Sequence, residues 1–457
     1  MIASLRAAAL LFIGFLAAFL SQSAPAEAQT RPETFTLRNG MEVVVITDRR
    51  APVVTHQVWY RVGAADEPRG KSGIAHYLEH LMFKGTRTIQ PGEFSRTVAR
   101  NGGEDNAMTS WDYTAYYERI ARDRLELVMR MEADRMRNLR ILEEDIAAER
   151  DVIIEERRQR IDNNPGQVLS ERMRAMLFPH HPYGVPIIGW LHEIRALTRQ
   201  DALDFYSVYY APNNAILVVA GDVSAAELRP IAERTYGRLR PTEHLPARTW
   251  TADPPAVGPM RVTHRDEKVR QPSLSRLYPA VSYTTQQARE AYALDVAMEV
   301  LGGSETSRLY RALVEEQRLA VGAGASADTA GLGGGSVTLY ASPVSGVELA
   351  ALEAAMDAVV QRFLTEGPTE AELNRAKSSL AAAAIYARDS QESLAFWYGS
   401  SLAEGETLDD ILNWADRIRA VTREEALAAA RATLTVNSSV TGYLLPPQNQ
   451  SEAGGSE

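Results

Sequence analysis

The feature that most constrains the fold is an internal repeat with a spacing of 224 residues. The octapeptide ALTRQDAL begins at Ala196 and AVTREEAL begins at Ala420, and Asn213 and Asn437 stand at the same spacing. Each octapeptide leads into a β-rich stretch. Copies of about half the chain can each bury their own core, so the repeat predicts two homologous domains. The alternative is a coincidence between two helix starts, because threonine is a favoured helix cap.

Within each half, strand-like stretches alternate with amphipathic helical patterns. Residues 34–48 and 52–64 read as strands, and Arg38-Asn39-Gly40-Met41 is typical of a tight hairpin turn. We therefore expect an α+β fold with two homologous domains, each a mainly antiparallel sheet covered on one face by helices.

The boundary between the two domains is marked by prolines. The segment Pro241–Met260 contains five of them, which exclude a helix interior or a central strand. We place a linker at residues 246–262, between an N-terminal domain at 29–245 and a C-terminal homologous domain at 263–447. The remaining Ser-, Glu- and Gly-rich residues, 448–457, are expected to form a disordered tail.

The N-terminus has the pattern of an export signal. One arginine precedes an apolar run from Ala7 to Leu20, and Ala26-Glu27-Ala28 offers a small-x-small cleavage site. We expect a signal peptide at residues 1–28, a periplasmic or secreted chain, and no stable membrane span after cleavage. The alternative is an uncleaved anchor.

Composition excludes several kinds of site. The chain has no cysteine, so disulfides, thiolate metal ligands and a cysteine nucleophile are excluded. The net charge of −10 argues against a nucleic-acid partner. Any metal ion must therefore be held by histidines and carboxylates.

The segment Gly73–Thr86 holds His76, Glu79 and His80 in the order H-x-x-E-H. On a helix these residues share one stripe, and imidazoles one turn apart can bind a single zinc ion. The order is the inverted form of the zinc-protease helix motif. Glu79 is then placed to take a proton from water as the general base. The alternative is a solvated polar face on an ordinary helix.

A third ligand is expected from the helical pattern at residues 139–161. Glu149 and Glu156 fall on its apolar stripe. An unpaired buried carboxylate is costly, so inward glutamates indicate a cation partner. We expect Glu156 to be the third zinc ligand and Glu149 to support catalysis. The alternative is that they pair with Arg150 or Arg157.

Several stretches resemble the pitrilysin-type inverted zincins, in particular the branch that contains the mitochondrial processing peptidase and small bacterial two-domain peptidases. The matching stretches follow the family order over nearly the whole chain: HYLEHLMFKGT, NAMTSWDYTAYY, ERDVIIEE, HPYGVPIIGW, YYAPNNAILVVAGDV and SRLYRALVEEQRLAVGA. The resemblance implies the processing-peptidase-like metallohydrolase fold. It also implies that His76, His80 and Glu156 bind zinc, with Glu79 as base and Glu149 in support.

The resemblance also implies where a substrate binds. The stretch Asn106–Tyr117 alternates strand-like residues and is expected to form an edge strand. The resemblance places this strand beside the zinc, where an extended peptide adds to the sheet. Asn106 and Ala107 match positions that contact the substrate backbone. For Asn106, the alternative is a turn residue that follows Gly102 and Gly103.

The second half does not repeat the chemistry. No histidine follows His264, and the family's arginine and tyrosine, which reach the substrate from the second domain, correspond here to Val314 and Val321. We therefore expect a heterodimer with a related chain that supplies this Arg/Tyr pair. At the repeat spacing of 224 residues, the positions that correspond to His76, Glu79, His80 and Glu156 are Val300, Gly303, Ser304 and Leu380.

The function expected from these residues is that of a zinc-dependent endopeptidase acting on short or unfolded peptides. The alternative is a noncatalytic scaffold or assembly subunit of the same fold. A retained base and three retained ligands argue against that alternative, because a scaffold needs none of them.

Overall fold

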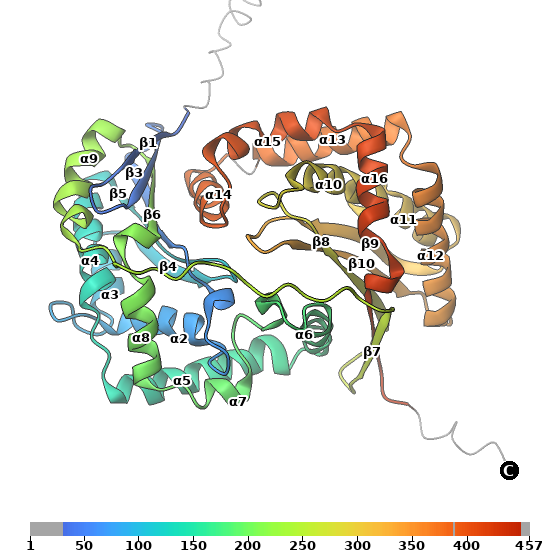
Figure 1. Ribbon diagram of the computed structural model, residues 1–457, viewed down its shortest axis with the longest axis horizontal. Helices are drawn as coiled ribbons and strands as arrows, with labels where there is room; N and C mark the ends of the chain where they lie inside the picture. The colour runs from blue at the N-terminus through green and yellow to red at the C-terminus, as the bar shows by residue number, and fades with distance from the viewer. Residues whose placement is uncertain (1–30, 387–388, 449–457) are drawn as a thin grey trace, which may run out of the picture.

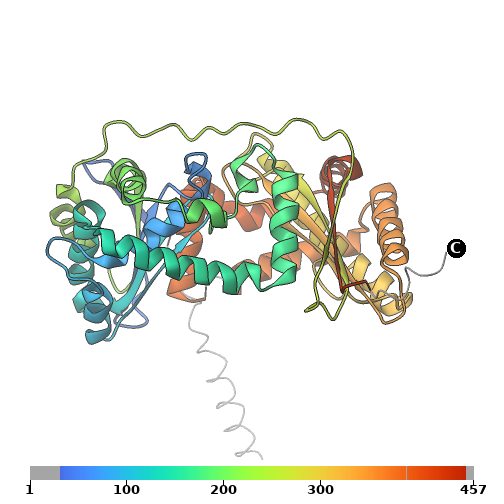
Figure 2. The same cartoon turned by 90° about the horizontal axis from the view of Figure 1, so that it is seen from below.

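The computed structural model describes residues 31–386 and 389–448. Two sheets with their helices stand side by side, and an extended segment passes from the first half to the second (Figures 1 and 2). The expected signal peptide at 1–28 and all but the first residue of the expected tail at 448–457 lie outside the described residues. Among the described residues, no helix has both the length and the apolarity needed to cross a bilayer.

The first sheet has six strands in the order β1-β2-β6-β3-β5-β4. Only β2 and β6 pair in parallel; the other neighbours are antiparallel. The expected tight turn after Leu37 joins β1 to β2. The strands are β1 (Glu33–Thr36), β2 (Glu42–Thr47), β3 (Val53–Tyr60), β4 (Glu104–Thr109), β5 (Thr114–Ala121) and β6 (Ala215–Gly221).

The second sheet has five strands in the order β7-β11-β8-β10-β9, again with one parallel pair, β7 and β11. This order repeats β2-β6-β3-β5-β4 of the first sheet. The repeated order confirms the predicted fold class of two like α+β halves. The strands are β7 (Met260–Arg265), β8 (Ser273–Ala280), β9 (Ala320–Asp328), β10 (Gly335–Pro343) and β11 (Val440–Leu445).

The octapeptide repeat begins a helix in each half. Thr198 caps α8 (Arg199–Tyr209) and Thr422 caps α16 (Arg423–Thr433), each through a capping box with the acidic residue three positions later. The segment between η7 (Tyr236–Arg238) and β7, which contains the five prolines, has no helix or strand.

One face of each sheet packs against the helices of its own half. In the first half the core includes Val58, Leu78 and Met129, all fully buried. Besides α8, the helices of the first half are α2 (Ile74–Leu81), α3 (Glu93–Arg100), α4 (Leu125–Asn138), α5 (Glu143–Arg157), α7 (Leu191–Ile194) and α9 (Ala225–Arg234). Besides α16, those of the second half include α10 (Ala288–Gly302), α11 (Arg308–Tyr310), α12 (Leu349–Glu366), α13 (Glu370–Tyr386) and α15 (Leu408–Ala420).

The opposite faces are covered by an exchange of helices, so the expectation of helices on one face only is wrong. Helix α14 (Gln391–Ala403) packs on β3 and β6 of the first sheet, and α6 (Pro165–Leu177) packs on β7, β8 and β11 of the second. Alternate residues of β6 point into the two layers, which explains why the whole strand is buried. The exchange joins the two halves into one body.

Both exchanged helices approach their sheets at a glycine. A Cβ on Gly399 of α14 would lie 2.1 Å from the indole of Trp59 on β3. On the other side, a Cβ on Gly442 of β11 would lie 2.2 Å from the sulfur of Met173 on α6. Each large side chain therefore occupies the space that the facing glycine leaves open.

Gly399→Ala is expected to lower the midpoint of urea unfolding. Alanine in a helix is ordinarily more favourable than glycine by about 1 kcal/mol. Here the added methyl group collides with buried Trp59, and such overpacking costs about 1–3 kcal/mol. The matched control is Gly258→Ala in the interdomain segment, where a Cβ meets nothing within 4 Å. A Gly399→Ala chain as stable as wild type would contradict this packing of α14.

Candidate active site

Helix α2 presents the motif histidines on the side that faces α5. Its N-terminus is fixed by the Glu67 carboxylate, which accepts hydrogen bonds of 2.9 Å from the amides of Gly73 and Ala75. The Tyr77 hydroxyl donates to the carbonyl of Ile146 and so ties α2 to α5. The apolar stripe of α2 enters the core, while the rings of His76 and His80 lie together with centroids 4.8 Å apart.

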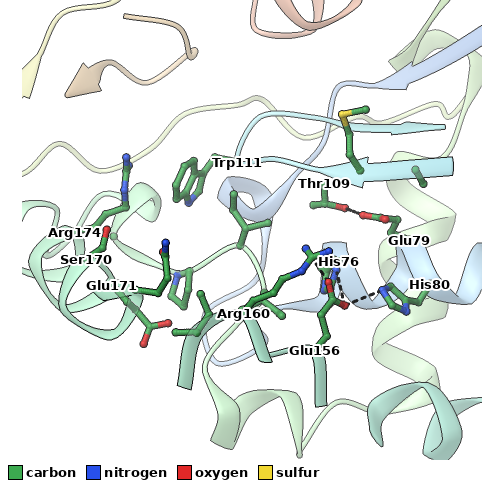
Figure 3. Close-up of a pocket in the computed structure, with 18 of the residues that line it drawn as sticks. His76, Glu79, His80, Thr109, Trp111, Glu156, Arg160, Ser170, Glu171 and Arg174 are labelled. Atoms are coloured by element: carbon green, nitrogen blue, oxygen red, sulfur yellow. Dashed lines mark hydrogen bonds and ion pairs between the residues drawn. The ribbon is translucent and has the colours of Figure 1, made fainter. Parts of the chain in front are cut away.

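Helix α5 brings Glu156 to the two imidazoles. Its Oε2 lies 3.6 Å from His76 Nε2 and 3.3 Å from His80 Nε2 (Figure 3). Within the part of the chain that the structure describes, His76, His80 and Glu156 form the one group of three potential metal ligands, with donor atoms within 4.8 Å of one another. The structure thus brings together the three residues that the sequence suggested as ligands.

The donor set fits a zinc ion. Two imidazole nitrogens and one carboxylate oxygen converge, and zinc in catalytic sites takes three such protein ligands. Burial and the nearby His80 lower the pKa of His76 to about 4, so its imidazole is neutral, the form that binds metals. Burial opposes protonation of His80, but hydrogen bonds to Glu149 and Glu156 raise its pKa on balance to about 9. The carboxylates of Glu149 and Glu156 therefore make the position of His80 favourable for a positive charge.

Glu149 lies behind His80 and does not line the cavity. Its Oε2 is 3.2 Å from His80 Nδ1, and its other oxygen forms an ion pair with Lys84. A carboxylate on the far nitrogen of a histidine fixes the ring orientation, as is usual for histidines that bind metals. Glu149 is therefore placed to position His80.

Glu149 and Glu156 do not pair with Arg150 or Arg157, the partners that the sequence suggested as an alternative to a metal. Arg150 donates to the carbonyl of Leu197, and Arg157 pairs with Glu171. Glu156 Oε1 instead lies 2.8 Å from Arg160, and Glu149 pairs with Lys84. Both partners stand four residues after a motif residue, Arg160 after Glu156 and Lys84 after His80. That helical spacing is a signal that could have found them.

Glu79 points toward β4 from the same helix. Its Oε2 accepts a hydrogen bond of 2.5 Å from the Thr109 hydroxyl, and burial raises its pKa. Thr109 was missed by sequence reasoning, since its contact with α2 depends on how the sheet packs. The hydrogen bond orients the carboxylate at the edge of the cavity.

The stretch Asn106–Tyr117 is a hairpin, so the expectation of a single edge strand is wrong. The segment Ser110–Asp112 connects the two strands, and the Ser110 amide donates to the Tyr113 carbonyl at 2.8 Å. Strand β4 lies at the edge of the sheet, and β5 lies inside it. Asn106 is exposed within β4 and is not a turn residue.

The ligands, Glu79 and β4 open into one cavity of about 800 Å³. Asn106 and Ala107 line it, as do Trp111 and part of α6. In the described part of the chain, the lining residues all fall between His76 and Ile188, in the first half. Val314 and Val321 are not among them, and Val321 is exposed on β9.

Comparisons with known proteins agree with this architecture. Residues 42–189 match the model for "Insulinase (Peptidase family M16)", and residues 196–380 match "Peptidase M16 inactive domain". Zinc protease PqqE of Helicobacter pylori is 32% identical over 379 residues, covering 82% of this chain and 84% of that protein. A crystal structure of a protease from Helicobacter pylori has a TM-score of 0.84 at 28% identity, covering 92% of this chain and 100% of that one. The first half of the periplasmic protease PqqL from Escherichia coli has a TM-score of 0.77 at 19% identity, covering 91% and 92%.

The two like α+β halves are those of a two-domain peptidase fold, and the first of them carries the His-His-Glu donor set. The chain belongs to peptidase family M16, as its match over most of the length of zinc protease PqqE shows. The family that the sequence motifs indicated is thereby confirmed.

Glu156→Gln is expected to weaken zinc binding by at least about 100-fold, because loss of a residue that merely supports a ligand already costs about 10–100-fold. Zinc affinity is measured by competition with a chromogenic chelator. The matched control is Glu155→Gln: the neighbouring glutamate is exposed and pairs with Arg158, so its removal leaves the affinity unchanged. Equal affinities in the two variants would show that Glu156 is not a ligand.

Proposed function

We propose that this chain is a zinc-dependent endopeptidase that cleaves short or unfolded peptides. The observation that carries the proposal is the convergence of His76, His80 and Glu156 in one cavity with Glu79 and an open strand edge. The retained donor set and base argue against a noncatalytic scaffold.

In this proposal His76, His80 and Glu156 hold the zinc ion. Zinc so held supplies Lewis acidity, which activates water near neutral pH and polarises a peptide carbonyl. Glu79 takes the proton from the attacking water and passes it to the leaving amine. Thr109 holds the Glu79 carboxylate in place, and Glu149 holds His80.

The substrate is an extended peptide that adds to β4. An edge strand offers unpaired backbone N–H and C=O groups, and such pairing demands little of the peptide sequence. Asn106 and Ala107 of β4 line the cavity, and in this proposal they contact the peptide backbone beside the zinc. A cavity of about 800 Å³ admits a few residues of extended chain but no folded domain.

The location of the protein is proposed to be periplasmic or secreted. The signal pattern at residues 1–28 supports export, and the similar fold of PqqL belongs to a periplasmic protease.

A second chain is proposed to complete the site as a heterodimer. The positions that correspond to the family's Arg/Tyr pair hold Val314 and Val321, whose aliphatic side chains donate no hydrogen bond. No residue of the second half is among the described residues that line the cavity. A related subunit that carries the Arg/Tyr pair would supply the missing donors.

Glu79→Gln is expected to lower kcat for an unstructured fluorogenic peptide by about 10²–10⁴-fold, the usual contribution of a general base. Bound zinc should stay unchanged, because Glu79 is not in the donor set. Glu144→Gln, in the exposed first turn of α5, is the matched control and should retain wild-type kcat. Wild-type turnover in Glu79→Gln would contradict the assignment of the base.

The purified single chain is expected to bind peptides but to turn them over slowly until its partner is added. Affinity purification of the native chain from its own organism should recover a related subunit that carries the Arg/Tyr pair. Mixing the two chains should raise kcat more than it lowers KM, since these donors act on the reacting carbonyl. Full activity of the single chain, unchanged by the second, would remove the heterodimer from the proposal.

A further inference from the structure

The end of the cavity away from the histidines carries Arg174, which has no carboxylate partner in the part of the chain that the structure describes. Arg174 of α6 lines the cavity together with the neutral polar residues Gln167 and Ser170. Among the described residues, Arg174 takes part in no ion pair and its guanidinium in no hydrogen bond. Figure 3 shows Arg174 on the far side of the cavity from His80, with Trp111 between it and Thr109.

The guanidinium is held by stacking. It lies 4.2 Å from the ring centroid of Trp111 and 5.7 Å from that of Phe178. Trp111 is itself fixed, since its indole N–H donates to the Val185 carbonyl at 2.9 Å. Stacking through the flat face leaves the hydrogen-bonding edge of a guanidinium free for a ligand.

Neighbouring acids do not neutralise Arg174. Glu171, one turn away along the cavity wall, instead pairs with Arg157, which donates two hydrogen bonds of 2.8 and 2.9 Å to its carboxylate. Asp112 is bound by Arg248 and Tyr183. Asp328 of β9, in the second half, attracts Arg174 electrostatically, but the two groups are too far apart to form an ion pair. A half-buried cation without a partner is costly, so this end of the cavity is suited to an anionic group.

Arg174 lies near the path that a peptide paired with β4 would follow. Thr109, which holds the base, ends β4, and Trp111 follows two residues later. At about 3.3 Å per residue, a peptide paired with β4 reaches Trp111 about two to four residues from the bond that faces Glu79.

We propose that Arg174, stacked on Trp111, forms a subsite for a carboxylate of the substrate. The enzyme then prefers peptides that carry an acidic side chain, or a free C-terminal carboxylate, two to four residues from the scissile bond. The inference rests on the proposed function, because its ligand is a peptide in this cavity. A guanidinium fork matches a carboxylate through two parallel hydrogen bonds, which lysine does not reproduce.

The test is peptide binding to the zinc-loaded full chain in which Glu79→Gln prevents cleavage. The probes are unstructured decapeptides: an all-glutamine host with an amidated C-terminus, the same host with one glutamate at each position in turn, and the host as a free acid. Isothermal titration should show at least about tenfold tighter binding for a glutamate peptide, which assigns a side-chain carboxylate, or for the free acid, which assigns the C-terminus.

Arg174→Met should abolish this difference, and Arg174→Lys should restore only part of it. Arg172→Met is the matched control, because Arg172 is on the same helix but outside the cavity, near His264, and should keep the full difference. Equal affinities for all peptides in the parent chain, or a difference that persists in Arg174→Met, would overturn the subsite alone. Failure of every peptide to bind would overturn the proposed function with it.

Discussion

The candidate site depends on one interaction, the contact of the Glu156 carboxylate with two imidazoles that lie one helical turn apart. The histidines need only α2, but the carboxylate must be brought from 76 positions beyond His80 by the packing of α5. Tyr77 ties α5 to α2 near its start, and Arg157 fixes its end by donating to the carbonyl of Gly189. Lys84 and Arg160 balance the acids from outside the donor set, so two carboxylates are kept close together without excess negative charge.

The duplicated fold gives the two halves different tasks. Both have the same strand order, but the described metal-ligand group and the cavity lining belong to the first half. The second half contributes α14, which covers the far face of the first sheet, and receives α6 in return. Because α6 also carries Arg174, the helix that docks the halves forms part of the cavity wall. Domain packing and the shape of the proposed substrate site are therefore coupled.

The local parts of this arrangement could be predicted from sequence, and the tertiary parts could not. Helical spacing alone indicated His76, His80 and the inward glutamates, because residues three and four apart share a helix face. The repeat indicated two like halves, yet its spacing of 224 residues holds for the starts of α8 and α16 and shrinks to 220 between the starts of β3 and β8. Loops of different length absorb the change, so a fixed offset does not map one half onto the other. Thr109, Trp111 and Arg174 reach the site only because the sheet and the two halves pack together. The residues around them in the sequence show no periodic pattern that predicts this packing.

The most direct measurement is a crystal structure of the zinc-loaded chain with anomalous diffraction at the zinc edge. We expect one strong peak about 2.0–2.2 Å from His76 Nε2, His80 Nε2 and a Glu156 oxygen, with a fourth position left for solvent or substrate. A fully loaded crystal whose only zinc peak lies elsewhere, or a Glu156 side chain turned away from the metal, would contradict it.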